Sequence, residues 1–320
     1  MKIIVIGGKG HIGTYLVPRL VDAGHEVTVV TRGQREPYRP HPAWRVVQQV
    51  TIDRVQAEQA GTFGPQIAAL EPEVVIDLIS FTLASTRHLV EALRGRVRHF
   101  LHCGTAWVKG FVVEAPTREE TPSPPFGEYG VNKAAIEDYL LQEARAGNLP
   151  ATMINPGHIS GPGWPVINPL GNANPSVFSQ LARGEPLYVP NFGMETLHHV
   201  HADDVAQVFS KALTHWSAAV GEPFFAVSPA AVTLKGYAHE AARWFGREAD
   251  LRFVPWEEWK VRCGLTPQDM ETSYDHLIRC QCYSMEKARR LLDYQPRYTS
   301  FAAILEAVEW MVAQEMIQAP

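Results

Sequence analysis

Short apolar runs and helical apolar patterns alternate along the first half of the chain. Residues 3–6 form a brief apolar run that predicts a strand, and Ile12, Leu16 and Leu20 follow with helical spacing. The next predicted elements are strands at 25–30, 44–47 and 73–79, helical patches within 57–70, a helix at 83–93 and a strand at 98–103. The run at 73–79 is apolar throughout, which is typical of a parallel strand covered on both faces. The alternation predicts an α/β fold, a doubly wound parallel sheet of the Rossmann type.

Three glycines lie between the first predicted strand and the first predicted helix. Gly7, Gly10 and Gly13 have the spacing G-x-x-G-x-x-G and enclose His11 and Ile12. Such a turn needs residues without a Cβ for a sharp bend, for close approach of a pyrophosphate and for close packing of helix on strand. The helix N-terminus then offers free N–H groups to an anion. The segment therefore predicts a dinucleotide site.

The end of the second predicted strand indicates which dinucleotide binds. An acidic side chain near this point holds a ribose 2′-hydroxyl, whereas an arginine accommodates a 2′-phosphate. The strand ends in Thr31, Arg32 and Gly33, with Arg35 beyond and no acidic residue at its end. We therefore expect NADP as the cofactor, with NAD less favoured.

A tyrosine and a lysine lie four residues apart at the start of a helix predicted to run to about residue 146. Tyr129 and Lys133 share one helical face, and Thr105 follows the strand predicted at 98–103. An ammonium group beside a phenol favours phenolate and is expected to lower the phenol pKa from its usual value of about 10. A tyrosine of this kind can exchange a proton with a carbinol while hydride moves to or from nicotinamide. We predict that Thr105, which can orient the reacting oxygen, completes the catalytic set.

Prolines and glycines interrupt the pattern over residues 161–175, which indicates a loop where the chain leaves the cofactor side. Beyond it, the chain predicts helices near 176–182, 202–212, 234–245, 285–292 and 301–316, and strands at 187–189 and 224–227. We expect residues 1–160 plus about 198–228 to form the dinucleotide-binding domain. Residues of about 161–197 plus 229–320 are expected to form a smaller C-terminal substrate lobe.

Composition narrows the class of partner. The 320-residue chain is 46% hydrophobic and 20% charged, with a formal net charge of -5, which argues against a nucleic-acid partner. Its four cysteines are too few and too scattered for a disulfide framework, which favours a reducing cytoplasm. The N-terminal apolar run is too short for a cleavable signal, and no stretch is long and apolar enough to span a bilayer. We expect a cytoplasmic protein that binds a small molecule and no membrane.

Histidines and aspartates gather between residues 198 and 204. His198, His199 and His201 precede Asp203 and Asp204, a combination that suggests metal binding at first sight. Their spacing matches no standard zinc set, so we expect no metal there. The two aspartates are expected to cap the helix that follows.

Motifs spread from residue 1 to about 310 resemble the extended short-chain dehydrogenase/reductases of the NAD-dependent epimerase/dehydratase family. They are GGKGHIG, HFLHCGTAWVKG, EETPSPP, YGVNK, INPGHISGPG, LHHVHADDVA and SMEKARRLLDYQP. The resemblance implies that Thr105 takes the serine/threonine position, Tyr129 that of the acid/base and Lys133 that of the ribose-binding lysine. It also implies cofactor contacts by Asp53 at the adenine, by Ile79 and Ser80 in the cleft, and by Asn155 and Pro156 beside nicotinamide.

The resemblance further implies a homodimer and leaves several roles open. Relatives commonly pair through the helices that correspond here to 83–93 and 132–146, and the second carries Ala134, Ile136, Leu140 and Leu141. Arg279 lies where some relatives bind phosphate, although a surface arginine is equally compatible. Four residues of the 161–175 loop are suited either to contacts with a sugar-like ligand or to turn formation, namely Trp164, Asn168, Asn172 and Asn174.

Departures from the family pattern bear on the reaction. Ala106 and Trp107 stand where nucleotide-sugar dehydratases carry an Asp-Glu pair, so elimination of water is disfavoured. Leu197 stands near a position where epimerases of the UDP type often have an arginine that grips the pyrophosphate. We expect an NAD(P)-dependent oxidoreductase that transfers hydride reversibly at a secondary alcohol or ketone of a sugar-like substrate. The alternatives are a nucleotide-sugar epimerase with tightly held cofactor, or an RNA-binding or cofactor-sensing protein like the chloroplast stem-loop RNA-binding branch.

Overall fold

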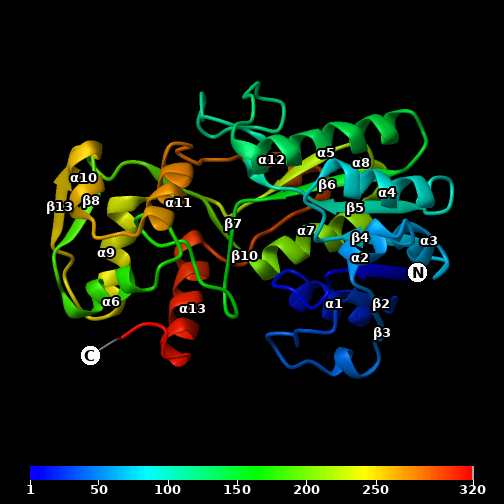
Figure 1. The fold of residues 1–320 in the computed structure, drawn as a ribbon, viewed down its shortest axis with the longest axis horizontal. Coiled ribbons are helices and arrows are strands. Elements are labelled where there is room, and N and C mark those ends of the chain that lie inside the picture. Colours follow the sequence, from blue (N-terminus) through cyan, green and yellow to red (C-terminus); the bar gives the residue numbers. More distant parts are fainter. Residues whose placement is uncertain (319–320) are drawn as a thin grey trace.

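The computed structural model describes residues 1–318 and is built on one parallel sheet (Figure 1). The seven strands are ordered β11-β6-β5-β4-β1-β2-β3, and every neighbouring pair is parallel. They are β1 (Lys2–Ile6), β2 (Glu26–Thr31), β3 (Gln48–Thr51), β4 (Val74–Asp77), β5 (His99–Cys103), β6 (Ala151–Pro156) and β11 (Pro223–Ala226). The predicted doubly wound α/β fold is therefore confirmed.

Helices cover both faces of this sheet because successive side chains of a strand point to opposite faces. Ile3 and Val5 pack with α1 (Gly13–Asp22), α7 (Ala202–Thr214) and α12 (Glu286–Leu292). Ile4 and Ile6 pack instead with the helices of the other face, α3 (Phe63–Ala68), α4 (Leu83–Leu93) and α5 (Gly127–Arg145). Two short helices, α2 (Arg54–Gln59) and α8 (Trp216–Ala219), complete this half of the molecule, which lies on the right of Figure 1.

A second core organises the smaller lobe on the left of Figure 1. Its helices are α6 (Ser176–Arg183), α9 (Leu234–Trp244), α10 (Trp256–Arg262), α11 (Pro267–Leu277) and α13 (Ser300–Ala313). Two two-stranded sheets accompany them: β8 (Leu187–Pro190) with β13 (Leu251–Val254), and β9 (Thr196–Leu197) with β12 (Val232–Thr233). A third, β7 (His158–Ser160) with β10 (His199–His201), lies between the two lobes in Figure 1. Trp259 is fully buried in this core, and its indole donates to Tyr188 O at 2.9 Å. The proposed domain boundaries remain a prediction.

The third strand lies later in the chain than its apolar pattern predicts. Residues 42–45 form a 3₁₀ turn that begins at Pro42, and His41 Nδ1 caps it by accepting from Ala43 N at 3.2 Å. The strand itself is β3, which is polar and pairs only with β2 at the sheet edge. An edge strand needs little apolar character, so its sequence carries no strong signal. The helical stretch within 57–70 is likewise two helices, separated at Gly61, whose φ of 68° ends the first.

The turn before α7 differs from the prediction that Asp203 and Asp204 cap the helix. The N-cap is His201, whose Nδ1 accepts from Asp203 N at 3.0 Å. Asp203 instead pairs with Arg19 at 2.7 Å, and Asp204 accepts from the backbone N–H of Arg297 at 2.8 Å. Asp203 also accepts from Arg297 Nη1 at 3.1 Å, so both aspartates attach the C-terminal segment to the main domain. Within residues 1–318, no group of three or more histidine, cysteine or acidic residues could hold a metal ion.

Three apolar residues of α5 face inward. Ile136, Leu140 and Leu141 belong to the core between this helix and the sheet, so they provide no outer surface for a partner. The predicted homodimer loses this supporting argument and remains a prediction. None of the helices in the described chain is both long and apolar enough to cross a bilayer.

A buried ion pair fixes the carboxyl end of β4. Arg54 Nη1 donates to both Asp77 oxygens at 2.9 and 3.0 Å, its Nε reaches Glu58 at 2.7 Å, and its guanidinium lies over Phe63. Burial alone would raise the pKa of the Asp77 carboxyl, but the Arg54 charge holds it below its usual value. The pair therefore ties the loop after β3 to the centre of the sheet.

Replacing Asp77 by Asn should lower the free energy of unfolding by about 3 kcal/mol, because Arg54 would keep a buried charge without its main partner. Because the folded-state pKa is depressed, the contribution of Asp77 is complete above its unfolded pKa of about 4 and is lost as pH falls through the folded value. Urea unfolding at pH 7 and pH 3 should show the difference between wild type and Asp77→Asn shrinking in acid. Glu73→Gln, which breaks an exposed pair with Arg98, is the control; equal losses in the two variants would contradict the assignment.

Candidate functional site

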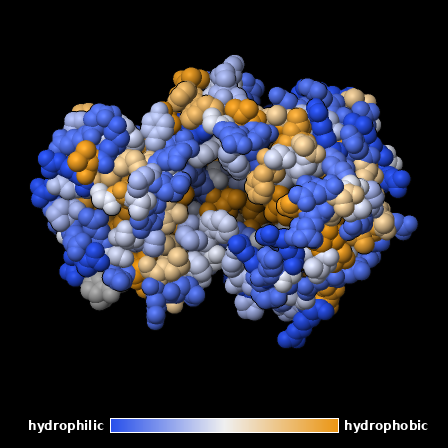
Figure 2. Space-filling view, in the orientation of Figure 1, coloured by the Kyte–Doolittle hydropathy of each residue, from blue (hydrophilic) through white to orange (hydrophobic). Residues whose placement is uncertain are grey.

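A deep cleft opens at the carboxyl ends of the sheet strands, next to β1 and β4. Crossovers leave these adjacent strands toward opposite edges of the sheet, since β2 and β3 follow on one side and β5 and β6 on the other. Such a switch point is where open α/β sheets bind ligands. The cavity there has a volume of about 550 Å³. Figure 2 shows it as a hollow with apolar residues at its centre, between the two lobes.

The glycine turn forms one side of this cavity. Gly7 has a φ of 81°, and a Cβ there would lie 2.6 Å from Ile79 Cγ2. A Cβ on Gly13 would lie 2.2 Å from Gly8 O, so this glycine lets α1 pack directly against the turn. Gly10 N donates to Gly7 O at 2.9 Å, and Gly10 lines the cavity. Gly7 thus provides the bend, Gly13 the close packing of the helix and Gly10 an open stretch of backbone. These are the three features that a dinucleotide site requires of such a turn.

A second cavity of about 380 Å³ continues from the first along the end of β2. It shares Gly7, Gly10, Arg35, Ile79 and Phe81 with the first cavity and adds Lys9, Thr31, Arg32, Ile52, Arg54, Val55 and Phe63, among others. The exposed Arg32 lies where the sequence predicts a cofactor contact. Asp53 lies outside the lining of both cavities, because its carboxylate caps α2 by accepting from Gln56 N at 3.1 Å. Its neighbours Ile52 and Arg54 do line the second cavity, and the predicted contact of Asp53 with adenine remains a prediction.

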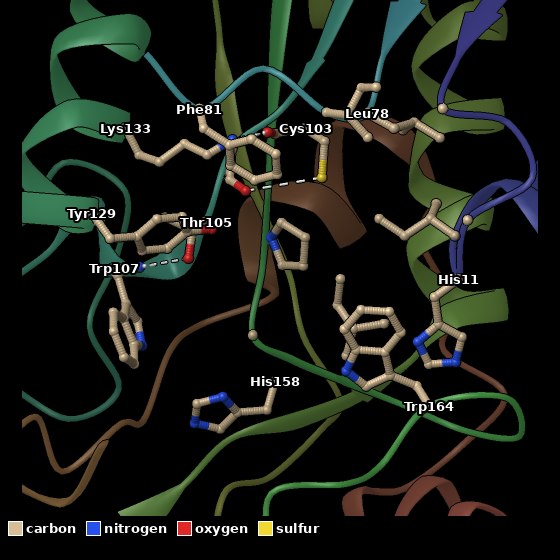
Figure 3. A pocket seen from close by; sticks show the side chains of 18 of the residues that line it. His11, Leu78, Phe81, Cys103, Thr105, Trp107, Tyr129, Lys133, His158 and Trp164 are labelled. Carbon is tan, nitrogen blue, oxygen red and sulfur yellow. Dashed lines mark hydrogen bonds between the residues drawn. The ribbon is translucent and has the colours of Figure 1, made fainter. Parts of the chain in front are cut away.

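Thr105, Tyr129 and Lys133 lie together on the side of the cavity opposite the glycine turn (Figure 3). The Lys133 ammonium is buried and donates to Ser80 O at 2.7 Å and to Cys103 O at 2.8 Å. These carbonyls follow β4 and end β5, so Lys133 connects α5 to two neighbouring strands.

The electrostatics of this set differ from the prediction. Burial raises the pKa of the Tyr129 phenol to about 12, and only the Thr105 hydroxyl opposes the rise. Burial also lowers the pKa of Lys133. The phenol is therefore held protonated at neutral pH because it is buried, and the Lys133 ammonium is not among the groups that lower its pKa.

Two residues predicted to touch the cofactor support the site from behind. Asn155 Oδ1 accepts from Thr105 N at 3.1 Å, and its Nδ2 donates to Glu137 at 2.5 Å. Ser80 is fully buried, and its hydroxyl pairs with Thr86 Oγ1 at 2.8 Å. Neither belongs to the cavity lining, whereas the predicted His11, Ile12, Ile79 and Pro156 do.

Sequence reasoning missed part of the cavity opposite the glycine turn. Trp107, His158 and His276 line it, from the segment after β5, from β7 and from α11 respectively. His158 lies in the motif INPGHISGPG, but nothing in the local sequence marks its imidazole as part of a ligand cavity. His276 lies in a helix that the sequence did not predict.

The residues of the 161–175 loop that are suited either to ligand contact or to turn formation fall into two groups. Its tryptophan lines the cavity, whereas two of its asparagines form the turn. Trp164 lines the cavity and stacks on His11, with ring centroids 5.7 Å apart. Asn168 and Asn172 are buried and hydrogen-bond to each other at 2.6 Å, so they form the turn. Arg279 is neither a surface residue nor part of the lining, because it is buried with its guanidinium 3.8 Å from the ring centroids of Trp107 and Phe126.

Comparison with known proteins agrees with this geometry. Residues 3–225 match the NAD dependent epimerase/dehydratase family. A 2'-dehydrokanamycin reductase of Streptomyces kanamyceticus is 26% identical, over 67% of this chain and 58% of that protein. A UDP-glucose 4-epimerase of Streptococcus mutans is 24% identical, with 95% of each chain covered. The solved structure of UDP-glucuronic acid 4-epimerase from Bacillus cereus in complex with NAD superposes with a TM-score of 0.73 at 18% identity, covering 98% of this chain and 99% of that one.

The family match covers more than half of the chain, and it confirms the resemblance read from the motifs. The chain belongs to the NAD dependent epimerase/dehydratase family and is an NAD(P)-dependent enzyme of the oxidoreductase and epimerase class.

Proposed function

We propose that this enzyme transfers hydride reversibly between NADP(H) and a secondary alcohol or ketone of a sugar-like small molecule, and that it releases the cofactor after each turnover. The observation that carries the proposal is the single cavity in which Thr105, Tyr129 and Lys133 face the glycine turn. A titratable phenol, a hydroxyl and a dinucleotide-type turn are the parts that such a reaction needs.

The chain's own residues provide the proton chemistry. A bound nicotinamide dinucleotide supplies the ring that gives hydride to the carbonyl carbon or takes it from the carbinol carbon. In the direction of reduction, Tyr129 donates its phenolic proton to the oxygen that becomes the hydroxyl. Thr105 orients that oxygen through its own hydroxyl, while Lys133 holds the helix that carries Tyr129. A phenol kept protonated, with a pKa of about 12, is in the form that donates this proton.

The end of β2 supports NADP(H) over NAD(H). Arg32 and Arg35 line the second cavity. Its other two cations are already paired, Lys9 with Glu36 at 3.2 Å and Arg54 with Asp77 at 2.9 Å. A 2′-phosphate carries charge that two arginines can match, whereas a ribose diol gains less from them.

The relatives support two fates for the hydride. The reductase of Streptomyces kanamyceticus is named for a substrate that is not a nucleotide sugar, which favours net reduction and cofactor release. The UDP-glucose 4-epimerase covers nearly the whole chain, so an epimerase with tightly bound cofactor is the second candidate.

The cofactor preference predicts a selective effect of Arg32. Arg32→Ala should weaken NADPH binding about tenfold and leave NADH binding nearly unchanged, because only the former loses a charged hydrogen bond. Fluorescence titration of both cofactors measures this. Arg96→Ala is the control, since that exposed arginine lies before the amino end of β5 and lines neither cavity. Wild-type protein that binds NADH as tightly as NADPH would refute the preference.

Tyr129→Phe should reduce turnover by about 10²–10⁴-fold and leave cofactor affinity nearly intact, because it removes only the exchangeable proton. Tyr139→Phe is the matched control on the same helix, where the hydroxyl meets Arg94 outside the cleft. Steady-state kinetics with a sugar substrate and NADPH separate the two variants. Near-normal turnover by Tyr129→Phe would exclude it as the acid/base.

Net hydride transfer and epimerisation predict different cofactor contents for the purified protein. A reductase must exchange its cofactor in every cycle, so desalting should yield protein without dinucleotide absorbance that needs NADP(H) in stoichiometric amounts. An epimerase must return the hydride to the same intermediate and therefore keeps its cofactor bound. Protein that elutes with a full complement of dinucleotide and inverts a sugar carbon with none added would establish the epimerase instead.

A further inference from the structure

Three aromatic side chains form the part of the cavity wall that lies opposite the glycine turn, next to Tyr129. We call Trp107, His158 and His276 the aromatic wall. Its ring centroids lie 4.8 Å apart for His158 and His276, and 4.9 Å apart for Trp107 and His276. Trp107 also meets the Tyr129 ring edge to face at 5.9 Å. The aromatic wall is therefore next to the proposed reacting oxygen, and Figure 3 shows Trp107 and His158 below Tyr129.

The hydrogen bonds of His276 determine what its other nitrogen can do. His276 Nδ1 lies 2.7 Å from Thr272 O, a carbonyl oxygen that can only accept. Nδ1 must therefore carry the hydrogen, and in the neutral ring Nε2 is left as an acceptor. His158 Nε2 is buried and has no hydrogen-bond partner among residues 1–318. The aromatic wall thus keeps hydrogen-bonding capacity that the described chain does not use.

The aromatic wall carries no formal charge at neutral pH. Burial lowers the pKa of His276 to about 4, and it lowers that of His158 well below its usual value, with His276 adding to the effect. Arg279, behind Trp107, is covered by aromatic rings and donates to Asp275 O and Phe126 O.

The remaining charges of the cavity lie elsewhere. Within the described chain, its lining includes no carboxylate, and its two cationic side chains are Arg35 and Lys133. Arg35 also lines the second cavity, and Lys133 is held by two backbone carbonyls. A diphosphate placed against the aromatic wall would therefore meet no cation there, whereas a hydroxyl would find an acceptor.

Building on the proposed function, we propose that the aromatic wall determines substrate specificity: His158 and His276 bind hydroxyl groups of an uncharged sugar-like ring, and Trp107 packs against its apolar face. The substrate class is thus a neutral polyhydroxylated ring and not a nucleotide diphosphate sugar. A site built to hydrogen-bond a hydroxyl also discriminates strongly against analogues that lack it.

The test measures binding directly, with the full chain saturated with NADP⁺. Calorimetric titration uses methyl α-D-glucopyranoside, methyl α-D-galactopyranoside, myo-inositol and UDP-glucose as probes. We expect at least one neutral probe to bind, with UDP-glucose no more than threefold tighter than methyl α-D-glucopyranoside. His276→Phe should weaken the neutral probe about tenfold, the loss of one hydrogen bond of about 1.4 kcal/mol, and His276→Gln should recover part of it by restoring an acceptor. His158→Phe should act in the same direction, and the NADP⁺ affinity should stay within twofold in every variant.

The matched control is His239→Phe, an exposed histidine on α9 in the smaller lobe. No binding of any neutral probe, UDP-glucose binding tenfold tighter than its methyl glycoside, or unchanged affinities in both Phe variants would each overturn the proposal. Turnover is followed separately by NADPH absorbance. Probes that bind through the aromatic wall without any Tyr129-dependent turnover would refute the proposed function alone, whereas turnover unaffected by the His158 and His276 variants would refute the specificity assignment alone.

Discussion

The buried ammonium of Lys133 is the interaction on which the arrangement of the site depends. It donates to a carbonyl after β4 and to one at the end of β5, and it lies one helical turn after Tyr129. A buried charge is costly unless its hydrogen-bonding capacity is used, so the two carbonyls hold α5 at a defined height above the sheet. Burial raises the pKa of the Tyr129 phenol to about 12, and Lys133 is not among the groups that lower it. Lys133 therefore acts here mainly by fixing the position of the helix that carries Tyr129.

The same edge of the sheet is supported on both sides by polar contacts that do not face the cavity. Asn155 holds the backbone of Thr105 from beneath, and the Arg54–Asp77 pair anchors the second cavity. Asp203 pairs with Arg19 of α1, and Asp204 accepts from the backbone N–H of Arg297, which attaches the C-terminal segment to the main domain. These polar groups have defined partners, which favours one arrangement of the segments around the cleft over others.

The cavity is electrostatically divided. Cationic side chains gather at the end that begins at Arg32, whereas the end at Trp107, His158 and His276 offers neutral hydrogen-bonding groups and aromatic faces. Such a division suits a reaction in which an anionic dinucleotide meets an uncharged polyol, because each ligand is attracted to a different end. Tyr129 lies between the cationic end and the aromatic end. An acid/base at this point can exchange the proton that hydride transfer at a carbinol requires.

The sequence alone determined the fold class, the glycine turn and the Thr105, Tyr129 and Lys133 set, because strand and helix periodicities and short motifs are local properties. It also placed most helices and strands of the main domain to within a few residues. It misplaced the polar edge strand β3, whose stability comes from pairing with β2 and not from its own residues.

Only the tertiary structure showed that Asp53 caps a helix, that Asn155 and Ser80 lie behind the cavity, and that Ile136 faces the core. His276 joins His158 and Trp107 only through packing of the smaller lobe against the sheet. Contacts between residues more than a hundred positions apart leave no periodic trace in the chain, so the side of the cavity that we assign to the substrate was decided by the fold.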